Sequence, residues 1–161
     1  MVETAARVAL LVALVICAVV DLRERRIPDI VLLPAFALVA GLWLLALFQG
    51  SGPWQLVERL CTAAGALAVF TLVRLASCGR LGSGDAKLAA LIGFVLGARG
   101  WLLALLIASA AGTVAAVALI AAGRLRRSDP IAFAPFLALG AVGALFAEPL
   151  VARALAAAVA G

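Results

Sequence analysis

Long apolar runs separated by short polar stretches dominate this 161-residue chain and limit its fold more than any other feature. Hydrophobic residues make up 67% of the chain and charged residues 13%, far outside the range of soluble domains. A helix needs about 20 apolar residues to cross a bilayer, and most of the runs approach that length. We therefore predict an all-α, polytopic membrane helix bundle, a single domain over residues 1–161 with about six transmembrane helices. The predicted spans are 5–20, 30–48, 60–76, 87–98, 101–122 and 131–147.

The basic residues predict how these helices are oriented. Nine of the thirteen lie in or beside the first, third and fifth connections. Because Lys and Arg are enriched in cytoplasmic loops, the odd-numbered connections are predicted to face the cytoplasm. The short fourth span could be re-entrant, but the clusters 23–26 and 124–127 would then lie on opposite sides, so we expect it to cross. Residues 148–161 could extend the sixth helix or lie on the membrane surface.

The composition argues against several kinds of function. The chain has no histidine, and its three cysteines have no CxxC spacing, so we expect no metal site and no cofactor. A serine protease would lack its usual base for the same reason. The basic residues are divided among the connections instead of forming one stripe, which argues against a nucleic-acid partner.

Among the eight acidic residues, Asp21 and Asp85 are the strongest candidates for a chemical role. Asp21 follows the apolar run "ALLVALVICAVV", where a lone carboxylate is costly unless it is solvated or paired, although it could be only a polar stop at the membrane edge. Asp85 ends the stretch "GSGD" and could simply begin a helix by facing free backbone N–H groups. Gly82 and Gly84 permit backbone angles and close approaches that a side chain would forbid, which favours a loop that places this carboxylate against another group.

The predicted topology places Asp21 and Asp85 at the same cytoplasmic rim, because the first ends an inward-running helix and the second begins an outward-running one. Two facing carboxylates can share one proton, so that the charged member takes a proton from water while the neutral member polarises a carbonyl. We therefore predict an aspartyl protease pair. Because the C-terminus of a helix disfavours negative charge and the N-terminus favours it, we expect Asp21 to hold the shared proton.

Three neighbouring residues are candidates for a supporting role. Pro28 and Asp29 in "RIPDIVLLP" suit the first position and the first turn of the second helix, so helix initiation accounts for both. Lys87 follows the "GSGD" stretch, and we expect its side chain to extend to the membrane interface more than to act in catalysis.

Three stretches resemble those of a known family, the type IV prepilin peptidases. "GSGDAKLAALIGFVLG" looks like the GxGD motif of that family, and "DLRERRIPDIVLLP" looks like its other aspartate segment. "IAFAPFLALGA" is similar to its Pro-Phe-Gly-Pro-Phe run, with Ala132 and Ala134 in place of the usual proline and glycine. The resemblance implies that Asp21 and Asp85 are the catalytic pair and that the two glycines of GxGD shape their loop.

The resemblance also implies a function. The family consists of membrane endopeptidases that remove the leader of prepilins and pseudopilins on the cytoplasmic side of the inner membrane. Larger members also N-methylate the new terminus and carry an added region with paired CxxC motifs, whereas the first connection here is short and has no cysteine. We expect peptidase activity, leave methylation open, and favour the compact type of tight-adherence (Flp) pilus systems, with preflagellin peptidases close behind. The alternative is a non-catalytic membrane protein, either a small transporter or an assembly subunit.

Overall fold

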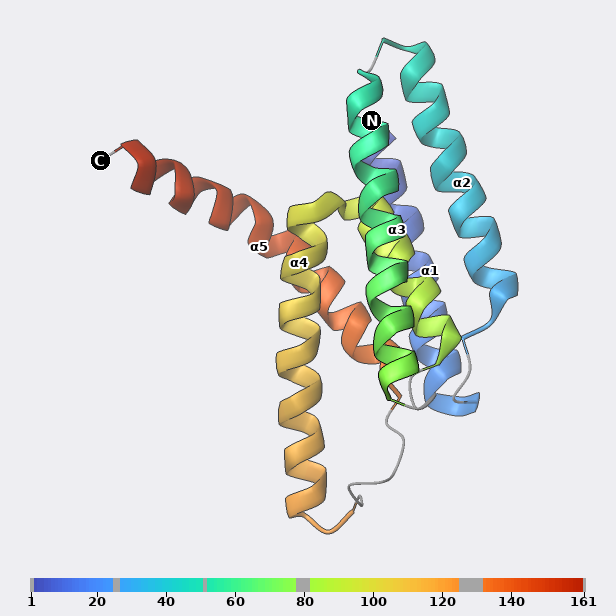
Figure 1. Cartoon of the computed structure of the whole chain (residues 1–161), viewed down its shortest axis with the longest axis vertical. Coiled ribbons are helices and arrows are strands. Elements are labelled where there is room, and N and C mark those ends of the chain that lie inside the picture. The colour runs from blue at the N-terminus through green and yellow to red at the C-terminus, as the bar shows by residue number, and fades with distance from the viewer. Residues whose placement is uncertain (1, 25–26, 51, 78–81, 125–131, 161) are drawn as a thin grey trace.

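The computed structural model describes residues 2–24, 27–50, 52–77, 82–124 and 132–160, with side chains described as far as Val151 except at Pro149. Within these ranges the chain forms five helices and no strand, which confirms the predicted all-α class (Figure 1). Four of the helices are long and apolar enough to cross a membrane, and the fifth contributes a shorter apolar segment. The helices are α1 (Val2–Glu24), α2 (Asp29–Phe48), α3 (Pro53–Ala76), α4 (Ser83–Ala121) and α5 (Ala134–Ala160).

The first three predicted spans lie within α1, α2 and α3, but the fourth and fifth are joined in α4. This helix reverses its direction at Gly97, where φ is +71° and ψ is −178°. A positive φ of this kind is readily adopted only by glycine. The arm before the bend, residues 83–96, is about 21 Å long at the usual helical rise, shorter than a hydrocarbon core of about 30 Å. Figure 1 shows the second arm of α4 returning toward the end of the bundle where the first arm begins.

The sixth predicted span corresponds to α5. Its predicted first residue, Ile131, lies outside the described residues, and the helix begins at Ala134. The predicted extension of the sixth helix is present, because α5 continues to Ala160. The orientation was predicted from nine basic residues. Five of these lie outside the described residues, namely Arg25, Arg26, Arg80, Arg126 and Arg127.

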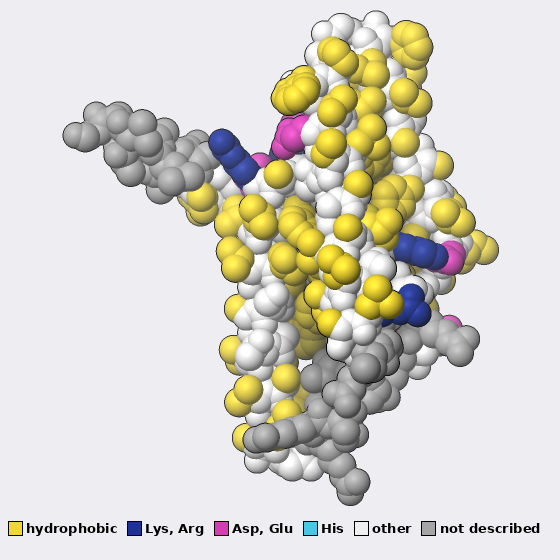
Figure 2. Space-filling view, in the orientation of Figure 1, with side chains coloured by type: hydrophobic (Ala, Val, Ile, Leu, Met, Phe, Trp, Pro, Cys, Tyr) yellow, Lys and Arg dark blue, Asp and Glu magenta, His cyan; other side chains and the backbone are white. Residues whose placement is uncertain are grey.

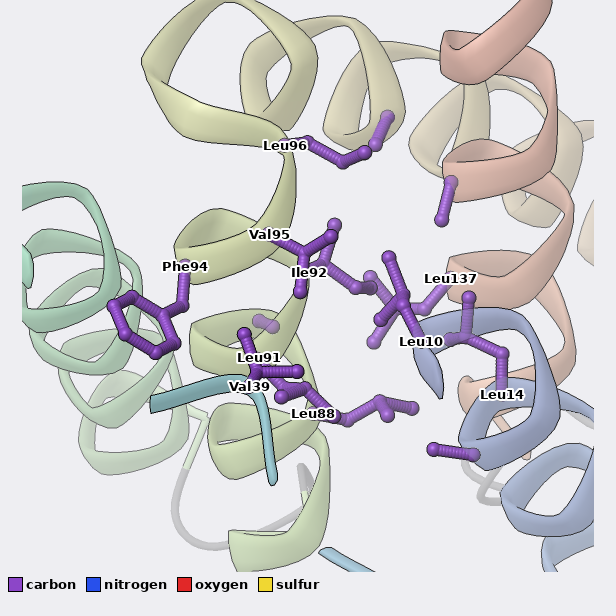
Figure 3. Packing of buried hydrophobic residues seen from close by; sticks show 14 of the residues in the cluster. Leu10, Leu14, Val39, Leu88, Leu91, Ile92, Phe94, Val95, Leu96 and Leu137 are labelled. Atoms are coloured by element: carbon purple, nitrogen blue, oxygen red, sulfur yellow. The ribbon is translucent and has the colours of Figure 1, made fainter. Parts of the chain in front are cut away.

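The first arm of α4 forms the centre of the bundle. Leu88, Leu91 and Ile92 on this arm are almost completely buried. Figure 3 shows Ile92 facing the side chains of Leu10 on α1 and Leu137 on α5. Large apolar side chains are also exposed on the outer faces of the helices, and Figure 2 shows them spread over the surface. Such a surface suits contact with lipid, so the chain is a membrane protein.

Gly140 lies at a close approach between the backbones of α4 and α5. A Cβ atom added there would lie 2.1 Å from the carbonyl oxygen of Ala104 and 2.9 Å from the Cβ of Ala108. Because the two backbones would have to separate, we expect Gly140→Ala to lower the free energy of unfolding by about 1–3 kcal/mol. Thermal unfolding in detergent measures this effect. The matched control is Gly65→Ala on α3, where a Cβ meets nothing within 4 Å and should be neutral or slightly stabilising; equal effects of the two changes would contradict this view of the packing.

Candidate active site

Asp21 and Asp85 are the two buried charged residues in the described part of the chain, with 6% and 7% of their surfaces exposed. Asp21 continues the buried stripe of α1, which includes Leu10, Leu14 and Cys17. The helical spacing of three and four residues therefore turns this carboxylate toward the core and away from lipid. Asp85 lies in the first turn of α4, at the start of its buried arm.

Asp21 contacts the beginning of α5. Its Oδ2 accepts a hydrogen bond of 3.2 Å from the main-chain N–H of Ala134, the first residue of that helix. The helix that carries Asp21 continues past it to Glu24. The carboxylate therefore faces the N-terminus of α5 as well as the C-terminal turn of its own helix. This contact also brings residues 132–141, the described part of the third motif-like stretch, to the site.

Asp85 performs the helix-starting role that its position predicted. Its Oδ2 accepts a hydrogen bond of 3.2 Å from the main-chain N–H of Gly82, the residue that precedes α4. Its Oδ1 is buried and has no hydrogen-bond partner among the described residues. Buried polar atoms are nearly always paired in folded proteins, so an unpaired oxygen such as this one is unusual. It is the part of Asp85 that is free to act on another group.

Gly82 and Gly84 matter because they lack a side chain, which lets neighbouring groups approach closely, and not because of their backbone angles. The described glycines with positive φ are Gly50, Gly97 and Gly123. The expectation of special backbone angles at Gly82 and Gly84 is therefore wrong. The expected close approach is present. A Cβ atom on Gly84 would lie 2.5 Å from the Cβ of Ile27, and one on Gly82 would lie 3.1 Å from Oδ2 of Asp85.

The supporting candidates form a link between α2 and α4. The Nζ of Lys87 bonds both carboxylate oxygens of Asp29 at 2.7 Å, so this side chain does more than extend to the membrane interface. Pro28 lies one position before the first helical residue instead of at it, and its carbonyl oxygen accepts hydrogen bonds from Val31 and Leu32. Both members of the ion pair are about half exposed, so the pair contributes little stability.

These contacts bring the two buried carboxylates to the same end of the bundle. Ile27 against Gly84 and Asp29 against Lys87 hold the connection that follows α1 against the start of α4. Asp21 lies six residues before Ile27, and Asp85 follows Gly84 directly, so both carboxylates lie at the end of the bundle where these two residues meet. Two buried carboxylates at one end of a bundle are candidates for sharing a proton and activating water. Among the described residues, no cluster of three or more His, Cys, Asp or Glu side chains is arranged to hold a metal ion.

The sequence assigned no special role to Glu58 and Arg59, but both contact the bend in α4. Arg59 donates a hydrogen bond to the carbonyl oxygen of Val95, and Oε1 of Glu58 accepts one of 3.4 Å from the N–H of Ala98. These backbone groups flank Gly97, where the helical hydrogen bonding is interrupted. Two adjacent residues of α3 thus satisfy backbone groups on both sides of the bend. The signal in the sequence was a pair of adjacent charges near the start of a largely apolar helix.

Arg59 also holds the ends of two other helices. Its guanidinium bonds Glu3 on α1 at 3.0 Å and lies 4.2 Å from the ring centroid of Trp43 on α2. Because its removal leaves several of these groups unpaired, we expect Arg59→Leu to lower the free energy of unfolding by about 2–3 kcal/mol. Chemical denaturation in detergent measures the change. The control is Arg99→Leu, an exposed arginine just beyond the bend, which should have a much smaller effect; equal losses would contradict a bracing role for Arg59.

Comparison with known proteins identifies the family of the chain. A model of the type IV leader peptidase family matches residues 8–117, a range that contains both aspartates. The prepilin leader peptidase/N-methyltransferase of Bacillus subtilis (strain 168) is 30% identical over 129 residues, which cover 80% of this chain and 50% of that protein. The chain thus spans about half the length of this curated relative, and no solved structure gives a significant match. Because the family model covers more than half of the sequence, the chain belongs to the type IV leader peptidase family.

Proposed function

We propose that this protein is a membrane aspartyl endopeptidase that removes the leader from a prepilin or pseudopilin-like protein at the cytoplasmic face of the inner membrane. Membership of the leader peptidase family supports the peptidase activity, and the name of the Bacillus subtilis relative supports a prepilin-like substrate. The observation that carries the aspartyl mechanism is the burial of Asp21 and Asp85 at one end of the bundle.

The proposed chemistry uses the two carboxylates and a water molecule. In a largely apolar setting two neighbouring carboxylates repel each other when both are ionised, so they hold one proton between them. The ionised carboxylate accepts a proton from water as the water oxygen attacks the scissile carbonyl, and the protonated one donates to the carbonyl oxygen. The reaction needs no metal or other cofactor.

The ion pair between Lys87 and Asp29 is proposed to support this site from outside. It lies next to the Gly84 contact and is partly exposed, and exposed pairs contribute only about 0–1 kcal/mol. We therefore expect Asp29→Asn or Lys87→Ala to slow leader cleavage less than about tenfold. Initial cleavage rates measure the loss, and exchanging the two charges by Asp29→Lys with Lys87→Asp should restore part of it. A complete loss of activity in either single variant would show that the pair belongs to the reacting groups.

Reconstitution with a prepilin encoded in the same genome tests the proposed function directly. The purified chain and the prepilin are combined in lipid vesicles, and the loss of the leader is measured by mass spectrometry. We expect a single cut that separates the leader from the mature protein, and the same spectrum reports any methyl group added to the new terminus. If the inserted, folded chain cleaves none of the prepilins of its genome, the non-catalytic alternative replaces this proposal.

A further inference from the structure

The hydrogen bond from α5 distinguishes the two carboxylates of the pair. The carbonyl oxygen of Phe133 accepts the first bonds of α5, from Phe136 and Leu137, so the N–H of Ala134 has no partner inside its own helix. Ala134 is 0% exposed, which removes water as a partner. Asp21 supplies the acceptor. Its carboxylate therefore lies at the positive end of the α5 dipole, a position that stabilises negative charge.

Asp85 also lies at a helix N-terminus, in the first turn of α4, but it has fewer hydrogen-bond donors than an ionised carboxylate needs. Both oxygens of an ionised carboxylate need hydrogen-bond donors, and a buried charge without them is costly. Oδ2 has one donor, the N–H of Gly82, but Oδ1 is buried without a partner among the described residues. The nearest cation on the same helix, Lys87, is engaged by both oxygens of Asp29. A neutral, protonated carboxyl suits this position better than a charged one.

We propose that the N-terminus of α5 sets the roles within the pair, an inference that rests on the peptidase function proposed above. Asp21 carries the negative charge and takes the proton from water, and Asp85 carries the shared proton and donates it to the scissile carbonyl. The main-chain N–H of Ala134 is then a positioning group that acts through Asp21. This assignment reverses the expectation from sequence, which considered only the helices that carry the two aspartates.

Every bond and proton in the proposed steps is accounted for. The water oxygen bonds to the carbonyl carbon while one water proton moves to Asp21 and the proton of Asp85 moves to the carbonyl oxygen. When the tetrahedral intermediate collapses, the C–N bond breaks and the proton on Asp21 moves to the leaving nitrogen. One hydroxyl proton of the intermediate returns to Asp85 as the new carboxyl group forms. The pair ends in its starting state with one water consumed.

Carboxyl-carbon NMR of the unmodified chain tests the assignment of the proton. The sequence has only four aspartates, so a chain labelled with ¹³C at the aspartate carboxyls gives few signals, and the Asn variants assign each of them. At neutral pH we expect the signal of Asp21 in the range of an ionised carboxylate and that of Asp85 in the range of a protonated carboxyl. The reverse arrangement, or the same state at both residues, would overturn the proposal.

Ala134→Pro tests the positioning role of α5. Proline is favoured at the first position of a helix, and it lacks the N–H that Asp21 accepts. We expect kcat to fall by roughly 10- to 100-fold with little change in KM, because the lost bond stabilises a charge that acts in the reaction. The labelled signal of Asp21 should also move toward the protonated range. The matched control is Ala132→Pro, which adds a proline to the same stretch but keeps the N–H of Ala134.

The outcomes separate this inference from the proposed function. If the chain cleaves a prepilin but the proton lies on Asp21, or if the two proline variants have equal kcat, the role assignment fails and the peptidase function stands. If the chain cleaves no prepilin, the proposed function itself fails. Should Ala134→Pro not fold, the spectrum of the unmodified chain still decides the position of the proton.

Discussion

Replacing either Asp21 or Asp85 with asparagine is expected to reduce leader cleavage by roughly 10⁴-fold or more. Asparagine keeps the size of the side chain. It cannot accept a proton from water, and it has no acidic proton to donate to a carbonyl. Both residues are buried near one end of the bundle, and no other acidic side chain in the described part of the chain is buried with them. The measurement is the rate of leader removal by the reconstituted variants, followed by mass spectrometry.

The control for these variants is a carboxylate that is near the pair and exposed. Glu24 ends α1 three positions after Asp21, and Glu24→Gln should leave the rate nearly unchanged. Membrane insertion and helix content should match the unmodified chain in all three variants. Activity within tenfold of normal in a folded Asp21→Asn or Asp85→Asn variant would remove that residue from the proposed mechanism.

Gly84→Ala is expected to reduce cleavage by about 10²-fold, because displacing a catalytic group by about 1 Å has effects of this size. A Cβ atom there would lie 2.5 Å from the Cβ of Ile27, so either the first connection or the start of α4 must move. Asp85 follows Gly84 directly and would move with it. The cleavage rate and the unfolding temperature of the variant should be measured together, since the rate should fall more than stability explains.

A second change tests whether the contact with Ile27 causes this loss. Because the Cβ of Ile27 is the atom that a new side chain would meet, Ile27→Gly in the Gly84→Ala background should recover part of the activity. Gly65→Ala, which meets nothing within 4 Å, should leave the rate near normal. A Gly84→Ala variant as active as Gly65→Ala would show that the close approach is not required.

The helices and the two buried acids follow largely from local sequence patterns. Apolar runs predicted six spans, two of which are joined in α4, because a segment that lies in lipid must satisfy its own backbone hydrogen bonds. Asp21 continues the spacing of Leu10, Leu14 and Cys17, so a helical pattern alone turns it inward. The glycines of "GSGD" predicted a close approach at Gly84, although they did not identify Ile27 as the partner.

The remaining features depend on contacts between distant parts of the chain. Asp21 and Ala134 are 113 positions apart, and a helix-end argument confined to α1 missed the donor on α5. The reversal at Gly97 depends on Arg59 and Glu58, whose contacts across to α4 are visible only when the helices are packed together. Asp29 and Lys87 each had a sufficient local explanation, and their pairing is a property of the fold.

The most direct test of the account compares the two single asparagine variants with the double variant, Asp21→Asn with Asp85→Asn. Residues that act as one unit in catalysis show losses that do not multiply. If the two carboxylates work as a pair, the double variant should cleave the prepilin no more slowly than the slower single variant. Losses that multiply, or one single variant that keeps nearly normal activity, would contradict a shared role for Asp21 and Asp85.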